Sequence, residues 1–122
     1  MAETPHTEAT TGAQLYTTAR SLRDRVVINV RGETDLSNIA SFTGKLAEHA
    51  TAPWLVCNMT EVAFCSVAGA RVLEHAAIRA AATAQRFEVI AGHHVARLLA
   101  ATRLADVITC AGDRDAIATV RR

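Results

Sequence analysis

Two short stretches in the first third of the chain are candidate β-strands, and in the second of them hydrophobic residues alternate with polar ones. The first stretch covers residues 14–19 and the second covers residues 25–31, where valine and isoleucine are frequent. A period of two and a high share of β-branched side chains are typical of β-strands. The pattern therefore predicts two strands, the second of which should end at Gly32, since glycine often interrupts a strand.

A helical spacing of apolar residues follows the second strand. Apolar side chains recur every three or four positions, at Ile39, Phe42, Leu46 and Ala50. Asp35 or Ser37 can cap a helix that begins near Asn38, and Pro53 marks its end.

The middle of the chain combines a short apolar run with a long alanine-rich segment. Residues 54–59 are almost continuously apolar, which indicates a strand covered on both faces. Ser66 is expected to cap a helix over residues 67–85, because the many alanines there favour a helix that packs closely on a sheet. The inner side of this helix is predicted to carry Leu73, Ala76 or Ala77, Ala80 and Ala84.

The last third continues the alternation. It predicts a strand over residues 87–91, a short helix over 95–102, a strand over 107–109 and a helix over 113–120, capped by Asp113. Two strands followed by alternating helices and strands imply an α/β fold with parallel crossovers. We expect a mixed sheet of four to five strands with about four helices packed against it.

Domain organisation is simple. Residues 1–12 are polar and rich in threonine and are predicted to be a disordered tail, whereas residues 13–122 are predicted to form one domain. A chain of 122 residues can bury one core but not two.

Composition excludes several classes of function. The net charge is +1 and aromatic residues make up 4%, which argues against direct binding of nucleic acid. No apolar stretch indicates a signal peptide or membrane insertion, so a cytoplasmic location is expected. The three cysteines are odd in number and contain no CxxC pair, unlike a disulfide-stapled secreted domain.

Three segments of the chain resemble a known family. Residues 27–36 read VINVRGETDL and resemble a strand followed by a G-E-x-D-L loop. Residues 56–69 read VCNMTEVAFCSVAG and resemble a strand, a V-x-F loop and a D-S-S-G turn that opens a helix. Residues 94–108 read HVARLLAATRLADVI and resemble the helix and last strand that follow. These motifs are those of the STAS domain family, of the bacterial anti-sigma-factor antagonist type, and the match runs from about Gln14 to the end.

The resemblance implies a regulator of transcription that binds another protein and is not an enzyme. Family members of this type bind a kinase-like anti-sigma factor and so release a sigma factor. Many are switched off by phosphorylation of the first serine of D-S-S-G. Here Ser66 stands in place of the aspartate, Val67 in place of the phosphorylated serine, Ala68 in place of the second serine, and Gly69 matches the glycine. Because Val67 has no hydroxyl, the usual phosphoacceptor is absent.

The resemblance also implies a docking surface made of two segments that meet at one end of the sheet. Its expected residues are Thr34, Asp35, Leu36 and Ser37 in the first segment, and Cys65, Ser66, Val67, Ala68, Gly69 and Ala70 in the second. Two of them have a second interpretation. Ser66 is more simply a helix N-cap than a displaced phosphosite, and Asp35 is equally a helix cap or a partner for a basic side chain.

Cysteine and histidine offer weaker candidate chemistry. Cys65 and Cys110 are a candidate redox pair if their Cα atoms lie within about 7 Å, whereas Cys57 is expected in the core. His93 and His94 lack further ligands at suitable spacing, so no metal site is predicted. No catalytic, nucleotide-binding or cofactor motif occurs in the sequence.

Two alternatives to the antagonist stay open. The first is an accessory subunit of STAS type in a lipid-transporting membrane complex, which a basic or apolar exposed face on the second helix would favour. The second is a small nucleotide-binding or hydrolytic protein, which needs a pocket with converging polar groups. A homodimer is compatible with each of these.

Overall fold

The first two strands form an antiparallel hairpin. A computed structural model of the chain describes residues 14–110. In it β1 (Leu15–Ser21) pairs with β2 (Val26–Thr34) from Leu15–Gly32 to Ser21–Val26. Both strands occur where the alternation predicts them, but β2 continues through Gly32 instead of ending there. Gly32 has φ of +102°, and a Cβ at this position would lie 2.3 Å from the carbonyl oxygen of Gln14, so only glycine fits at this irregular point of the strand.

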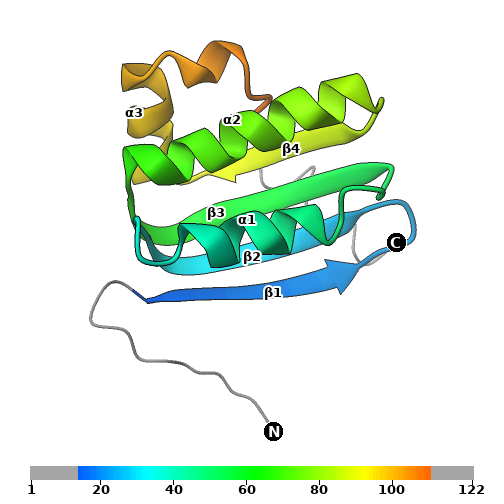
Figure 1. Cartoon of the computed structure of the whole chain (residues 1–122), viewed down its shortest axis with the longest axis horizontal. Coiled ribbons are helices and arrows are strands. Elements are labelled where there is room, and N and C mark those ends of the chain that lie inside the picture. The colour runs from blue at the N-terminus through cyan, green and yellow to red at the C-terminus, as the bar shows by residue number, and fades with distance from the viewer. Residues whose placement is uncertain (1–13, 111–122) are drawn as a thin grey trace, which may run out of the picture.

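Two further strands complete a mixed sheet. β3 (Trp54–Cys65) pairs parallel with β2, and β4 (Arg86–Ala91) pairs parallel with β3, so the strand order is β1-β2-β3-β4 (Figure 1). The prediction that the third strand ends at Met59 is wrong. After a shift in register, β3 pairs again with the last residues of β2, and this pairing extends the strand through the predicted V-x-F loop to Cys65.

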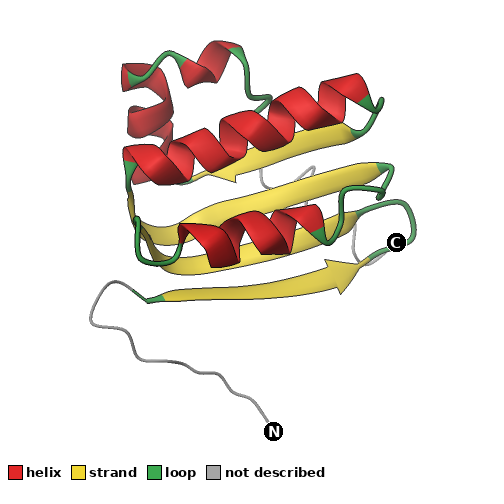
Figure 2. Cartoon of the chain, viewed as in Figure 1, coloured by secondary structure: helices red, strands yellow, loops and turns green. Residues whose placement is uncertain are grey.

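Within residues 14–110, three α-helices cover one face of the sheet (Figure 2). They are α1 (Ile39–Ala47), α2 (Val67–Ala82) and α3 (His93–Ala101). Their buried side chains meet the helix-facing residues of the strands in one core, which includes Phe42, Leu46, Leu73 and Leu99 from the helices and Ile28, Leu55, Cys57 and Val89 from the strands. The predicted core positions Phe42, Leu46, Leu73, Ala76, Ala80 and Cys57 are confirmed.

The ends of two helices differ from prediction. α2 stops at Ala82, and the chain then turns at Ala84, whose φ is +61°; Ala84 is exposed and is not part of the inner stripe. α3 begins at His93 with Gly92 as N-cap, so His93 and His94 lie in its first turn and not in a preceding loop.

The strand predicted over residues 107–109 does not form. Arg103 has φ of +64°, which ends α3, and the chain continues as a short 3₁₀ helix, η1 (Leu104–Asp106). A single parallel bridge then joins Cys110 to Val89 of β4. The predicted tail over residues 1–12 and the predicted helix over 113–120, with its cap Asp113, lie outside the described residues.

The face of the sheet opposite the helices carries an aromatic ring between two cations. Trp54 pairs in register with Arg86 of β4, and Arg25 precedes β2 beside it. The guanidinium carbons of Arg25 and Arg86 each lie 3.8 Å from the centre of the Trp54 ring. Glu88 completes the group, because it accepts a hydrogen bond from Trp54 Nε1 at 3.1 Å and pairs with Arg86 Nε at 2.8 Å. The register of neighbouring strands therefore places a guanidinium on each side of one ring.

Candidate functional site

The two predicted docking segments meet where β2 and β3 end. Thr34 and Cys65 are register partners, and the amide nitrogen of Ser66 donates to the carbonyl oxygen of Thr34 at 3.0 Å. Since α1 follows β2 and α2 follows β3, the loop after Thr34 and the first turn of α2 lie at the same end of the sheet (Figure 1). We call this region the junction; it comprises residues 34–37 and 64–70.

Ser66 caps α2. Its backbone is extended (φ −78°, ψ 168°), and its Oγ accepts a hydrogen bond from the amide of Gly69 at 3.1 Å. Its carbonyl oxygen accepts from Ala70 N at 3.0 Å, the first bond of the helix. The capping interpretation is thus confirmed, and a cap of this kind contributes about 1 kcal/mol. The hydroxyl that is nearest to the family's phosphoacceptor position is therefore engaged in holding the helix start.

Beneath this turn, α2 packs directly on the end of β2. Thr34 is completely buried, and its Oγ1 has no nitrogen or oxygen partner for a hydrogen bond. Gly69 faces it so closely that a Cβ at position 69 would lie 2.2 Å from this Oγ1 and 2.9 Å from Cys65 Sγ. Gly69 is therefore required for the approach of the helix to the sheet, and not merely tolerated.

Burial divides the predicted docking residues into two groups. Thr34, Cys65, Gly69 and Ala70 are buried and support the junction from within, so they contribute little to its surface. The solvent-facing group has two strongly exposed apolar members, Leu36 at 83% and Val67 at 53%. Ser37 is also exposed, while Asp35, Ser66 and Ala68 are half-buried.

Phe64 belongs to the solvent-facing group but is missing from the predicted site. It is 52% exposed, pairs with Glu33 in the register, and directly precedes buried Cys65. The V-x-F pattern at residues 62–64 predicts a loop, in which the direction of a side chain cannot be inferred. Had β3 been extended to Cys65, the alternation of a strand would have placed Phe64 on the face opposite Cys65.

The loop after β2 is held by its own polar side chains. Asp35 Oδ1 accepts from the amide and the hydroxyl of Ser37, at 2.8 and 2.6 Å. Asn38 Oδ1 accepts from Asp35 N at 3.0 Å, and Asn38 Nδ2 donates to Glu33 O at 2.9 Å. The prediction that Asp35 or Ser37 caps α1 is wrong, since Asn38 occupies the N-cap position. Asp35 instead closes a local turn, which holds Leu36 out toward solvent.

The cysteines are not arranged for redox chemistry. Cys57 and Cys65 are buried, and burial raises the pKa of both thiols, although contact with the Thr34 hydroxyl acts to lower the pKa of Cys65. Cys110 is exposed and forms a β-bridge with Val89 of β4. On its other side Val89 pairs with Cys57 of β3, so β4 lies between the two cysteines. Cys65 lies eight residues after Cys57 on β3, next to β2. The structure therefore does not bring Cys65 and Cys110 together.

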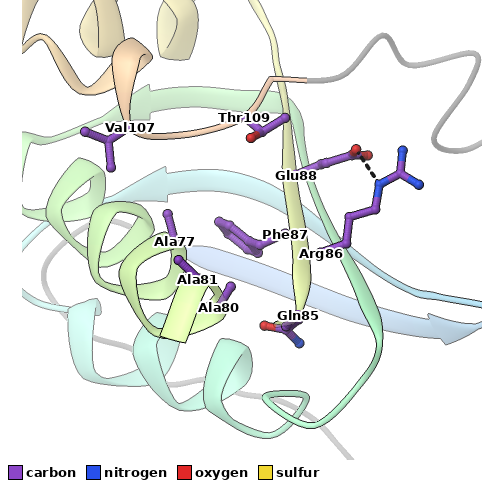
Figure 3. Close-up of a pocket in the computed structure, with 9 residues that line it drawn as sticks. All are labelled: Ala77, Ala80, Ala81, Gln85, Arg86, Phe87, Glu88, Val107 and Thr109. Atoms are coloured by element: carbon purple, nitrogen blue, oxygen red, sulfur yellow. Dashed lines mark hydrogen bonds and ion pairs between the residues drawn. The ribbon is translucent and has the colours of Figure 1, made fainter. Parts of the chain in front are cut away.

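A hollow of about 350 Å³ lies away from the junction, between the end of α2, β4 and the segment after η1 (Figure 3). Ala77, Ala80 and Phe87 line its apolar side. Its amide, guanidinium and carboxylate groups are already engaged: Gln85 Nε2 donates to the carbonyl oxygens of His49 and Ala52, and Arg86 pairs with Glu88 on the other side of the strand. The hollow therefore lacks the converging free polar groups of a catalytic or nucleotide pocket.

Two further observations concern the described part of the chain. Among residues 14–110, no three His, Cys, Asp or Glu side chains gather as metal ligands, and the rings of His93 and His94 stand edge to face with centres 5.8 Å apart. None of the helices within the same residues has the length and apolar character needed to cross a bilayer.

The sheet order, the helices on one face and the capped turn at the start of α2 define a mixed α/β domain. The family model described as "Mlab, STAS domain" matches residues 17–109, and the chain therefore belongs to the STAS domain family. A search of curated proteins finds no match.

Solved structures show the same fold. An anti-sigma factor antagonist from Mycobacterium paratuberculosis is 21% identical, with a TM-score of 0.77 over 89% of this chain and 96% of that one. The antagonist SpoIIAA in its unphosphorylated form is 19% identical, with a TM-score of 0.69 over 87% of this chain and 96% of its own. The Bacillus cell fate determinant SpoIIAA in its phosphorylated form is 18% identical, with a TM-score of 0.66 over 87% of this chain and 100% of its own.

Proposed function

We propose that this chain is a cytoplasmic, non-enzymatic regulator of transcription that binds a kinase-like anti-sigma factor through the junction. Structures of anti-sigma factor antagonists share its fold, which supports this class of function. The observation that carries the proposal is the exposure of Val67 in the first turn of α2, at the position where the resemblance puts the family's phosphoacceptor. Leu36 and Phe64 add exposed apolar surface within three residues of the Thr34–Cys65 pair.

The chemistry of Val67 gives the proposed contact a fixed charge state. A phosphate at the start of a helix adds about −1.5 to −2 charges and lies beside the positive end of the helix dipole. Val67 cannot carry one, and the nearby Ser66 hydroxyl caps α2. The junction therefore stays neutral at this point in the presence of a kinase, and we propose that binding is permanent or is controlled elsewhere.

The decisive experiment measures affinity for candidate anti-sigma factors by calorimetry, using two matched variants. Val67 and Ile78 lie on the same helix and are 53% and 54% exposed. Val67→Asp should weaken binding at least about tenfold, because it places an uncompensated charge in a close-fitting contact. Ile78→Asp introduces the same charge at the same exposure outside the junction and should bind like the native chain. Equal affinities of Val67→Asp and native protein would remove the junction from the interface.

Regulation is tested separately by mass spectrometry after incubation with the kinase and ATP. The native chain should remain unmodified, and Val67→Ser should gain one phosphate and then lose affinity. Phosphate on Ser66 of the native chain, accompanied by loss of binding, would overturn the proposal of a contact without a phosphoswitch.

One observation favours the accessory-subunit alternative. Beyond the junction, the outer side of α2 carries Arg71, His75 and Ile78, a stripe that is exposed, partly apolar and partly basic. This is the surface that the alternative predicts. The Ile78→Asp variant separates the two functions, because loss of a partner with Ile78→Asp but not with Val67→Asp would assign binding to the outer stripe. Affinity capture that recovers an ATPase and a permease, in place of an anti-sigma factor, would have the same meaning.

A further inference from the structure

β1 has one side that no described strand pairs with. Within residues 14–110 it forms the edge of the sheet, and five of its seven residues are exposed. The amide of Leu22 donates to Arg25 O at 2.7 Å, and that of Glu33 donates to Gln14 O at 2.9 Å. In an antiparallel ladder these bonds fix which residues face β2, so the backbone groups of Leu15, Thr17, Ala19 and Ser21 point away from the sheet.

Proline, bulges and charged side chains, lysine above all, usually block pairing between chains at an edge strand. Of these features β1 carries one charged side chain, Arg20, and neither proline, lysine nor a bulge in its pairing with β2. The strand reads LYTTARS, and its pairing with β2 is continuous from Leu15 to Ser21. A regular seven-residue edge of this kind is a template for another strand.

We propose that two copies of this chain associate through β1, which pairs antiparallel with its symmetry mate about a two-fold axis at Thr18. This register uses the whole strand. Leu15 then pairs with the partner's Ser21, and Thr17 with the partner's Ala19, each through outward-pointing backbone groups. Tyr16 faces the partner's Arg20, and Thr18 faces its own mate, as non-hydrogen-bonded pairs in which side chains lie closest.

The side chains of β1 complement each other in this register. Tyr16 is 48% exposed, and Arg31 of β2 lies over its ring at 5.1 Å from the centre. The partner's Arg20 would approach the same ring from the opposite strand. The molecule already contains this arrangement at Trp54, whose ring lies between Arg25 and Arg86 from the two neighbouring strands. The dimer would repeat it at both Tyr16 rings.

The expected association is weak and reversible. One pair of seven-residue strands buries less than the roughly 1,200 Å² of a standard stable interface, so dissociation constants on the order of micromolar are expected. Sedimentation velocity of the full chain between about 1 and 200 µM should therefore show a concentration-dependent shift from monomer to dimer.

Proline at Ala19 tests the edge without disturbing the hairpin. The amide of Ala19 points outward, so Ala19→Pro removes a donor to the partner but none to β2, a position where edge strands accept proline. Ala19→Pro should be monomeric throughout the concentration range and keep the native circular dichroism, while Ala19→Ser should dimerise like the native chain. A native chain that stays monomeric at the highest concentration, or an Ala19→Pro dimer, would overturn the proposal.

Cross-linking tests the register. Thr18→Cys is made in a Cys110→Ser background and treated with diamide, which takes two electrons and two protons from two thiols as the disulfide forms. At the two-fold axis the Cα atoms should be about 4.5 Å apart, within the range for a disulfide. Ser21→Cys is the control, because its mate lies six residues away, or about 20 Å. Rapid dimer formation by Thr18→Cys alone is expected, and equal cross-linking of both variants would refute this register.

Failure of this proposal is distinguishable from failure of the proposed function. The two-fold axis at Thr18 lies opposite Asn29, five residues along β2 from Thr34, where the junction begins, so Val67→Asp should leave the dimer unchanged. Ala19→Pro and the native chain should likewise have the same affinity for an anti-sigma factor when both proteins are measured at concentrations below the dissociation constant of the dimer.

Discussion

Gly69 and Thr34 are packed so tightly that a methyl group on Gly69 would lie 2.2 Å from Thr34 Oγ1. This contact joins the first turn of α2 to the end of β2, and Gly69 is only two residues from the exposed Val67. The orientation of the proposed docking surface therefore depends on a buried contact that contains no exposed residue. Two glycines in helices of the chain show how specific this requirement is.

Gly69→Ala should destabilise the protein by roughly 1–3 kcal/mol, because Thr34 and Cys65 must move to admit the methyl group. Gly44→Ala is the matched control. Nothing lies within 4 Å of a Cβ at Gly44, and alanine in a helix interior is favoured over glycine by about 0.5–1 kcal/mol. Urea unfolding followed by the fluorescence of Trp54 measures both. Thr34→Ala should relieve part of the Gly69→Ala defect, and a Gly69→Ala protein as stable as the native one would contradict the clash.

The N-cap of α2 gives a second prediction. Ser66→Ala removes the acceptor of the Gly69 amide and should lower the free energy of unfolding by about 1 kcal/mol. Ser66→Asp restores an acceptor and adds a negative charge at the positive end of the helix, so it should be close to native in stability. The same urea titration compares the three proteins. Equal stability of Ser66→Ala and native protein would show that the cap contributes nothing.

The exposed apolar residues of the junction should dominate partner affinity. Phe64→Ala and Leu36→Ala should each weaken binding of an anti-sigma factor at least tenfold, if these two side chains are among the few central residues that each contribute about 2 kcal/mol or more to an interface. Val107→Ala is the control, as Val107 is 48% exposed but lies beside η1. Unfolding free energies should be unchanged in all three variants. Native affinity of both junction variants would move the interface elsewhere.

The features that were predicted correctly from the sequence are those set by interactions between residues close together in the chain. Ser66 was identifiable as a cap because a capping bond spans three residues and depends on local chemistry alone. The core positions Phe42, Leu46 and Leu73 follow from helical periodicity, which requires only that one face be buried. These features can be predicted from the sequence of one segment, because they do not depend on which other segments it packs against.

The features that the sequence did not predict correctly depend on contacts between segments that are distant in the chain. β3 continues past Met59 because the end of β2 offers it a partner after a register shift, which no local pattern reveals. The loss of the predicted strand over 107–109 has a similar cause, as its pairing with β4 is limited to one bridge. Phe64 was missed because its exposure depends on the extension of β3. The two predicted docking segments therefore meet at one end of the sheet, as expected, but they include buried residues and leave out the exposed Phe64.

Reactivity of the cysteines follows from their burial. In the native chain, iodoacetamide should modify Cys110 alone, because Cys57 and Cys65 are enclosed and burial raises the pKa of their thiols. Partial burial also raises the pKa of Cys110. Since the thiolate is the reacting form, the alkylation rate of Cys110 should rise with pH over a range above that of a free cysteine. Mass spectrometry of digests at several pH values measures this, and early labelling of Cys65 would contradict the buried junction.

The Trp54 group yields the last prediction. Glu88 is 7% exposed, and its carboxylate is satisfied by the Trp54 indole and the Arg86 guanidinium. Arg86→Ala removes one of these partners and one cation from the ring, and it should destabilise the protein by about 1–3 kcal/mol because a buried carboxylate is left half-satisfied.

A second substitution isolates the cause. Adding Glu88→Gln to Arg86→Ala removes the buried charge but keeps an acceptor for Trp54 Nε1, so the double variant should be more stable than Arg86→Ala alone. If the stranded carboxylate were unimportant, the two substitutions would simply add. Thermal unfolding of the four proteins in this cycle decides between these outcomes, and additive losses would assign the effect of Arg86 to its contact with the ring.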